Sequence, residues 1–264
     1  MINSKKISLD WWIVGALTIL FLGGLVTMTS FVSEQAFFQK QLLWVCIAVC
    51  IGYGVSRFDM RFLRQSRFLI ILFGVSVLML VSVLLFGKTI KGAQSWIDFG
   101  GFSFQPTDIA KLVLILVLAK YFSRRHIHIE HIRHLFISFA YTGILVFLVL
   151  LQPDFGSAMV FGFIWLGMAI LAGISKKHLI LLGVIGVTLG AIAWIFSFQE
   201  YQKKRIISFI QPMSDIRGSG YNAYQSMVAV GSGGLLGKGV GYGTQSRLNF
   251  LPEYQTDFIF AALS

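Results

Sequence analysis

The chain has 264 residues, of which 56% are hydrophobic and 12% are charged. Soluble domains carry about 25% charged residues, so this composition excludes a soluble domain and predicts a polytopic membrane protein. The formal net charge is +11, but the basic residues lie between apolar runs, which argues against a nucleic-acid partner.

A helix of about 20 residues crosses a bilayer. The apolar runs of this sequence are close to that length. The first begins at Trp11 without a small-residue cleavage pattern, so we interpret it as a retained span and not as a signal peptide. The sequence predicts an all-α helical bundle with seven complete spans, at 11–31, 37–55, 68–86, 106–122, 135–151, 155–174 and 179–198. An eighth run begins near Asp257 and is cut off. We therefore expect a single membrane domain over 1–264 that is incomplete at its C-terminus.

The basic residues predict the orientation, because short cytoplasmic loops carry an excess of Lys and Arg. One set of loops and ends holds Lys5, Lys6, Arg57, Arg61, Arg64, Arg67, Arg124, Arg125, Arg133, Lys176 and Lys177. The opposite short loops hold only Lys40, Lys88 and Lys91. The N-terminus is therefore predicted to be cytoplasmic, and the long segment 199–256 to form an extracytoplasmic loop.

This orientation places most carboxylates on the outer side. They are Glu34, Asp98, Asp108, Asp154, Glu200, Asp215, Glu253 and Asp257. A reaction centre would therefore face outward, where ATP is absent, so an ATP-driven mechanism is not expected.

The fourth span begins with two charges on one helical face. Gln105 and Pro106 precede Asp108, and Lys111 follows three residues later. Pro suits the first helical turn, and Asp108 lies near the positive end of the helix dipole. A Lys one turn inside a membrane helix needs an anionic partner or a wet cavity. The pattern is compatible either with an Asp108–Lys111 pair that ties helices together or with a Lys that meets an anionic substrate.

Two further polar positions on the outer side also have alternative interpretations. Asp154 stands in a very short break between the fifth and sixth spans, where it could cap the following helix or share a role with Asp257. Arg205 belongs to a basic cluster at the start of the long outer segment. Such a cluster usually contacts lipid head groups, but Arg also suits a pyrophosphate, whose oxygens its fork binds two at a time.

Other patterns have ordinary structural interpretations. Cys46 and Cys50 lie one helical turn apart in an apolar run and predict lipid- or helix-facing residues. The glycines in 231–243 fit neither a phosphate loop nor a dinucleotide fingerprint, which favours close packing or an adaptable loop. Four histidines lie in a basic loop, and we interpret them as side chains at the membrane interface. They are His126, His128, His131 and His134.

Five segments together resemble one family, the SEDS proteins of shape, elongation, division and sporulation, which include RodA, FtsW and SpoVE. The segments are 91–97, 104–111, 152–158, 225–239 and 250–261. They are ordered and spaced as in that family over nearly the whole chain. The amino-acid sequences of segments 91–97 and 246–252 slightly favour the RodA branch. The family has about ten spans, and the acidic pair that usually follows the Asp257 segment is missing here.

The resemblance implies a peptidoglycan glycosyltransferase of the bacterial cytoplasmic (inner) membrane. Such enzymes polymerise lipid II on the outer face and work with a class B penicillin-binding protein. The family's catalytic aspartate matches Asp257. The expected substrate-binding or supporting residues are Trp96, Gln105, Asp108, Lys111, Asp154, Arg205, Gln225 and Glu253. Asp108 stands where the family more commonly has Glu, a change that keeps the charge. No cofactor is implied with certainty; a divalent cation, Mg²⁺ or Mn²⁺, stays an open candidate.

In the implied reaction, Asp257 would act as general base on the 4-hydroxyl of the acceptor sugar. The leaving group, undecaprenyl pyrophosphate, would need positive charge from Lys111, Arg205 or a cation. Two other classes of function stay open. A cavity lined by the same charged residues would suit a lipid II flippase. Alternatively, an inactive scaffold could dock the penicillin-binding protein without polymerising lipid II.

Overall fold

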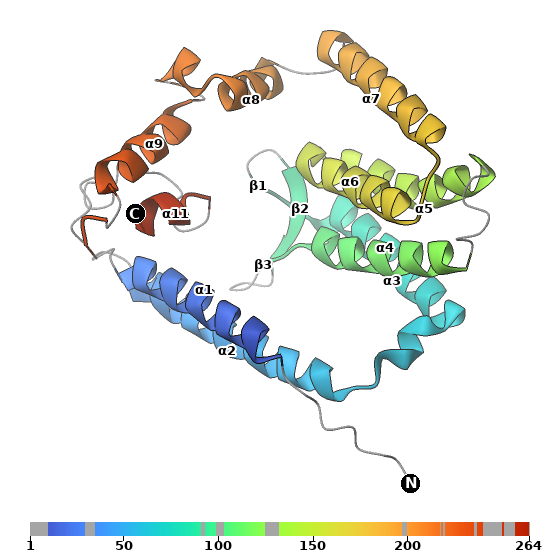
Figure 1. Cartoon of the computed structure of the whole chain (residues 1–264), viewed down its shortest axis with the longest axis horizontal. Coiled ribbons are helices and arrows are strands. Elements are labelled where there is room, and N and C mark those ends of the chain that lie inside the picture. Colours follow the sequence, from blue (N-terminus) through green and yellow to red (C-terminus); the bar gives the residue numbers. More distant parts are fainter. Residues whose placement is uncertain are drawn as a thin grey trace. The chain divides into compact units, whose positions relative to one another are not determined.

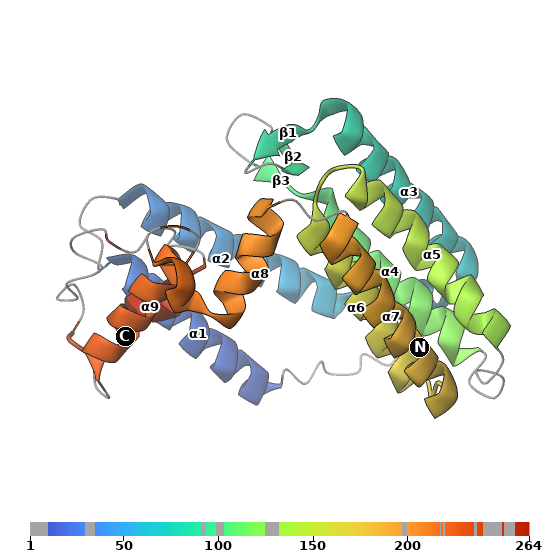
Figure 2. The ribbon, with the colours of Figure 1, turned by 90° about the horizontal axis from the view of Figure 1, so that it is seen from above.

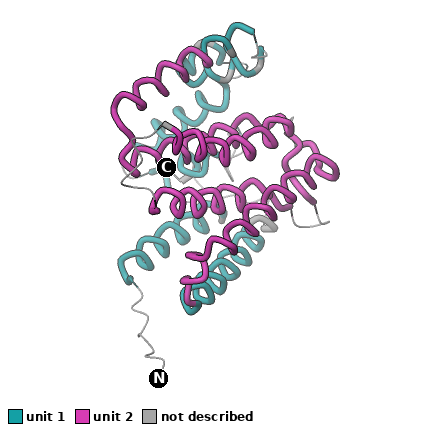
Figure 3. The backbone as a smooth tube through the Cα atoms, turned by 90° about the vertical axis from the view of Figure 1, so that its right-hand side faces the viewer, with its two compact units in different colours: residues 1–58, 191–264 teal, residues 59–190 magenta. Residues whose placement is uncertain are grey.

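The structure is a computed structural model that describes residues 10–29, 35–90, 93–98, 103–124, 132–196, 200–216, 218, 220–234, 237–239, 250 and 257–263. These residues form helices and one small sheet (Figure 1). The chain divides into two compact units (Figure 3). One is residues 59–190, and the other combines residues 1–58 with 191–264.

All seven predicted spans are helices. They are α1 (Trp11–Thr29), α2 (Gln35–Arg57), α3 (Ser66–Phe86), α4 (Pro106–Ser123), α5 (Ile132–Leu150), α6 (Phe155–Leu171) and α7 (Lys176–Phe196). Five of them, α1, α2, α3, α5 and α7, are long and apolar enough to cross a membrane. Helix α6 is shorter, with 17 residues, and α4 carries three charged residues along its 18. The fold is therefore that of an all-α multi-pass membrane protein, as predicted.

The expected outer segment 199–256 contains helices of its own. These are α8 (Glu200–Ile210), the short 3₁₀ helix η2 (Pro212–Asp215) and α9 (Tyr221–Gly233). The predicted eighth run begins a helix, α11 (Ile259–Leu263). The side of the membrane on which these elements lie, and the single-domain organisation of 1–264, stay predictions.

Helices α3, α4, α5 and α6 pack side by side to form the core of unit 59–190 (Figure 2). Their contact is filled by fully buried side chains, among them Leu80, Leu114, Leu145 and Phe161. Lipid tails are as apolar as these side chains, so tight packing rather than removal from water holds such helices together. One pair of buried polar groups joins α5 and α6 across the core: the Trp165 indole N–H donates to the Ser138 hydroxyl at 3.0 Å.

A small antiparallel sheet precedes α4, and the hydropathy pattern does not predict it. Its strands are β1 (Lys88–Ile90), β2 (Ala93–Asp98) and β3 (Ser103–Phe104), in the order β1-β2-β3. Lys88 pairs in register with Trp96, and its ammonium reaches the Asp98 carboxylate at 2.7 Å. The backbone N–H of Gln94 donates to the Gln152 carbonyl at 3.0 Å. The sheet is thereby tied to the turn between α5 and α6.

In the other unit, α11 packs against both α9 and α1. Ala229 of α9 and Ala261 of α11 are buried against each other, with Phe258 packed beside them. Small residues let helix backbones approach closely. This packing joins the chain directly after Asp257 to the helix that carries Gln225.

Several ordinary interpretations can be compared with the structure. Cys46 and Cys50 are exposed free thiols on α2, as expected for lipid-facing residues. Gly237 and Gly239 have φ angles of 74° and 92°, which favour glycine and fit an adaptable loop. His134 Nδ1 lies 3.1 Å from the Tyr121 hydroxyl; the other three histidines of that loop lie outside the described residues.

Candidate functional site

The start of α4 carries an ion pair on one face of the helix. Pro106 occupies the first turn, and the Lys111 ammonium lies 3.0 Å from the Asp108 carboxylate. The Lys111 side chain is 23% exposed and that of Asp108 is 65% exposed. The Asp108–Lys111 pair offered by the sequence therefore forms, and both of its members belong to α4.

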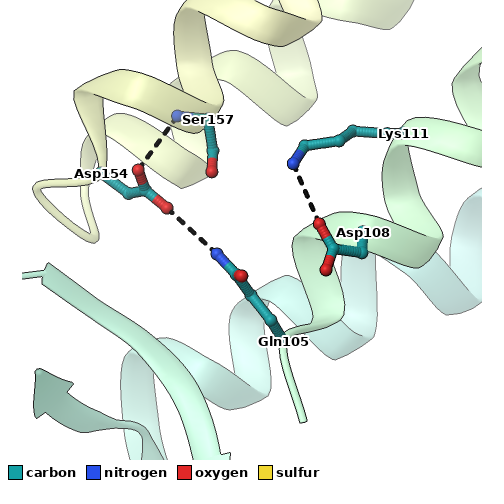
Figure 4. Close-up of polar contacts among 5 residues, drawn as sticks. All are labelled: Gln105, Asp108, Lys111, Asp154 and Ser157. Carbon is teal, nitrogen blue, oxygen red and sulfur yellow. Dashed lines mark hydrogen bonds and ion pairs between the residues drawn. The ribbon is translucent and has the colours of Figure 1, made fainter. Parts of the chain in front are cut away.

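The start of α6 lies beside the start of α4. One oxygen of Asp154 accepts the backbone N–H of Ser157 at 3.0 Å, which confirms that Asp154 caps α6. Its other oxygen accepts from the Gln105 side-chain amide at 3.5 Å, a long hydrogen bond. Figure 4 shows the side chain of Gln105, the residue before α4, reaching toward Asp154. The two helix N-termini are thus joined through one carboxylate.

This arrangement can receive an anion at Lys111. Both helices present the positive ends of their dipoles here, and the Lys111 ammonium has three donors, of which Asp108 takes one. The Asp108 side chain is exposed, and an exposed ion pair that water reaches is worth only about 0–1 kcal/mol. A phosphate oxygen could therefore share or replace this partner at little cost.

Gln152 is fully buried behind this site, and sequence reasoning did not select it. Its side-chain amide donates to the Leu80 carbonyl of α3 at 3.0 Å, and its backbone carbonyl accepts from Gln94. Its side-chain oxygen and the hydroxyl of the buried Thr107 have no hydrogen-bond partner within the described part of the chain. A Gln at the end of an apolar run was the available signal, because polar groups at membrane depth are costly.

We expect Gln152→Glu to destabilise the protein by about 2–4 kcal/mol, because it buries a carboxylate against the Leu80 carbonyl without a cation. The shape of the side chain is unchanged, so a loss would report on charge and hydrogen bonding alone. Thermal unfolding in detergent measures it. Gln65→Glu, at an exposed position before α3, is the matched control and should change stability little. Equal melting temperatures for the two variants would contradict the prediction.

Substitutions of Asp154 should separate its capping role from its charge. Asp154→Ala removes the acceptor of the Ser157 N–H and should cost about 1 kcal/mol of stability. Asp154→Asn keeps a good cap and should unfold near the wild-type temperature. If the Asn variant is as unstable as the Ala variant, the capping account of Asp154 is wrong.

Trp96 lies in the middle of β2, where its side chain is half-buried. The strand is held on both sides, by Gln94 contacts to Gln152 and to the Gly87 carbonyl at 3.0 Å, and by β3, which leads into Gln105. The sheet therefore fixes Trp96 relative to the starts of α4 and α6.

The remaining candidates belong to the other unit. Asp257 is exposed two residues before the start of α11, and Gln225 is half-buried on α9. Arg205 lies within α8, but its side chain and all of Glu253 lie outside the described residues. The structure thus gathers the site candidates into two groups, one in each unit, and brings Gln105, Asp108, Lys111 and Asp154 together in the first.

The described residues contain no group of three or more His, Cys, Asp or Glu side chains that could hold a metal ion. They therefore offer no all-protein metal cage. Mg²⁺ commonly uses only one or two carboxylates together with substrate phosphates. The described carboxylates would fit a cation of that kind, shared with a phosphorylated substrate.

Comparison with known proteins identifies the chain's relatives. A sequence profile of the FtsW/RodA/SpoVE family, described as cell cycle proteins, matches residues 4–264. The peptidoglycan glycosyltransferase MrdB of Escherichia coli K12 is 40% identical over 196 residues, which cover 73% of this chain and 52% of MrdB. The chain thus spans about half the length of that relative.

Two solved structures have a similar fold. One comes from a study of how a peptidoglycan synthase complex coordinates polymerization and crosslinking. That structure matches this chain with a TM-score of 0.74 and 29% sequence identity, and the match covers 86% of this chain and 67% of the other chain. The other is a variant of the rod shape determining protein RodA of Thermus thermophilus, with a TM-score of 0.60 and 29% identity over 69% of this chain and 59% of that one. The matched profile, the relative and the shared fold agree: this chain belongs to the FtsW/RodA/SpoVE family.

Proposed function

We propose that the protein is a peptidoglycan glycosyltransferase that polymerises lipid II into glycan strands. The relative MrdB is named for this activity, and one similar fold comes from a peptidoglycan synthase complex. The structural observation that carries the proposal is the joined start of α4 and α6. There Lys111 lies one turn inside α4, and a cation inside a membrane helix needs an anionic partner or a wet cavity.

Asp257 is proposed as the general base. The 4-hydroxyl oxygen of the acceptor sugar forms a bond to the anomeric carbon of the lipid-linked donor, and its proton passes to the Asp257 carboxylate. The exposure of Asp257 at the start of α11 leaves that carboxylate accessible to a sugar hydroxyl. Such positioned proton transfer contributes on the order of 10²- to 10⁴-fold.

The bond that breaks joins the donor sugar to undecaprenyl pyrophosphate. Charge builds up on the pyrophosphate as it leaves, and we assign its stabilisation to Lys111 and Arg205. Lys111 is half-buried and pre-positioned by Asp108, so little reorganisation is needed as the charge develops. A divalent cation would add positive charge at the same phosphates.

The proposed setting is the outer face of the bacterial cytoplasmic membrane, with a class B penicillin-binding protein as partner to crosslink the strands. The predicted orientation supports the outward face, and the similar synthase complex, which couples polymerization to crosslinking, supports the partner. Similarity to a rod shape determining protein favours a role in cell elongation over division.

The test is to give lipid II to the purified complete gene product in detergent and to resolve the products by gel electrophoresis. Glycan strands are expected, and detergent micelles have no two sides between which a flippase could act. If no lipid II is consumed while a penicillin-binding protein still co-purifies, the enzymatic proposal is overturned and a scaffold role is favoured. Intact lipid II together with transport in vesicles would favour the flippase.

A further inference from the structure

A second cluster of charged groups lies at the far end of α4 from the candidate site. It is formed by the last turn of α4 and by η1 (Met60–Arg64), the short helix before α3. The Lys120 ammonium donates to the Arg64 backbone carbonyl at 2.5 Å, which joins the two elements. Nine residues separate Lys120 from Lys111 along the helix, or about 13 Å, so this cluster is distinct from the candidate site.

Three cations meet at this junction: Arg64, Lys120 and Arg124, here called the basic triad. Lys120 lies in the last turn of α4 and Arg124 forms its C-cap, and the hydrogen bond from Lys120 to the Arg64 carbonyl brings Arg64 to the same helix end. Among the residues that the structure describes, no carboxylate pairs with any member of the triad. The negative end of the α4 dipole favours Lys120 and Arg124 individually, but it does not remove the repulsion among three like charges.

Arg61, on the same short helix, shows the contrast. Its guanidinium lies 3.5 Å from Asp59, and the same carboxylate accepts the Arg61 backbone N–H at 3.0 Å. Asp59, the carboxylate that the structure describes in this region, is therefore already committed to Arg61 and to the start of η1. The triad lacks a counter-ion of its own in the described structure.

Apolar side chains lie exposed next to these charges. Met60 and Phe62 of η1 are 37% and 39% exposed, and Phe62 stacks edge-on against Phe68 of α3 with ring centroids 4.9 Å apart. Cations beside exposed apolar groups at the end of membrane helices are typical of a segment at the membrane–water interface. A soluble anion would account for the charges but not for these apolar neighbours.

We propose that the basic triad binds the phosphate of an anionic phospholipid head group, with Met60 and Phe62 beside the lipid chains. Phosphate esters match the fork of Arg two oxygens at a time, and Lys120 has two N–H donors left after its bond to Arg64. The predicted orientation puts this end of α4 at the cytoplasmic leaflet, whose anionic lipids attract basic segments close to the membrane. This site is independent of the proposed catalytic function.

The test uses the complete gene product in neutral detergent, titrated with phosphatidylglycerol against a background of phosphatidylcholine, with retained lipid counted by native mass spectrometry. Arg64→Gln combined with Arg124→Gln removes two charges but keeps the Lys120 hydrogen bond, because that bond uses the Arg64 backbone. At about fivefold for each cation, phosphatidylglycerol affinity should fall about 25-fold. Arg61→Gln is the matched control and should change it less than about twofold.

Unchanged affinity in the double variant would overturn the proposal, as would an equal loss in Arg61→Gln, which would show general charge attraction. Displacement of phosphatidylglycerol by inorganic phosphate at similar concentration would identify a free-phosphate site instead. If the double variant does not fold, Arg64→Lys with Arg124→Lys keeps the charges and should retain most of the affinity. The wild-type protein must then also prefer phosphatidylglycerol over phosphatidylcholine, and equal affinity for the two lipids would reject the site.

Discussion

Asp257→Asn is expected to lower the rate of glycan strand synthesis from lipid II by about 10²- to 10⁴-fold, the usual contribution of a positioned proton acceptor. The amide keeps the size of the carboxylate but cannot take the proton of the sugar hydroxyl. Asp257 is exposed and precedes the short helix α11, so its substitution should hardly alter folding. The measurement is the initial rate of polymer formation by purified protein, with substrate binding measured separately.

Glu200→Gln is the matched control for that experiment. Glu200 is an exposed carboxylate in the same unit of the structure, 3.8 Å from Lys203 in an ion pair on α8. Surface pairs of this kind contribute about 0–1 kcal/mol, so its loss should change the rate less than about twofold. Normal strand synthesis by Asp257→Asn would remove Asp257 from the role of base. Equal losses in both variants would indicate a general need for negative charge.

The membrane helices were predictable because of the solvent they occupy. Backbone groups in a bilayer core must be paired within the segment, so each long apolar run had to be a helix, and all seven are. The sheet could not be found in the same way. Its strands are short, from two to six residues, lie between apolar runs, and depend on pairings such as Lys88 with Asp98 that only the folded chain brings together.

The candidate site was predictable where it is local in sequence. The Asp108–Lys111 pair follows from helical spacing, and the capping role of Asp154 follows from its place before α6. The contact of Gln105 with Asp154 joins residues 49 positions apart, and the bond from Gln152 to Leu80 joins residues 72 apart. Such contacts arise from the packing of α3, α4 and α6, which one sequence's periodicity does not specify.

Lys111→Met is expected to lower kcat by about 10²- to 10³-fold, because it removes a positioned donor from the departing pyrophosphate. Lys111→Arg keeps the charge with a different shape and should retain part of the activity. A steady-state rate assay with lipid II resolves kcat from KM. A loss confined to KM would mean that Lys111 binds the substrate and its transition state equally.

A drop in activity of Lys111→Met could instead come from unfolding, and the structure argues against it. The partner left behind, Asp108, is 65% exposed in the first turn of α4, which is predicted to lie at the outer membrane–water interface. Water can solvate it there, so the stability loss should stay below about 1 kcal/mol. Lys88→Met is the matched control, because it removes a cation from another ion pair of the same unit, 2.7 Å from Asp98. If Lys88→Met lowers kcat as much as Lys111→Met, activity depends on the total positive charge of this unit. Lys111 would then have no specific role in stabilising the leaving group.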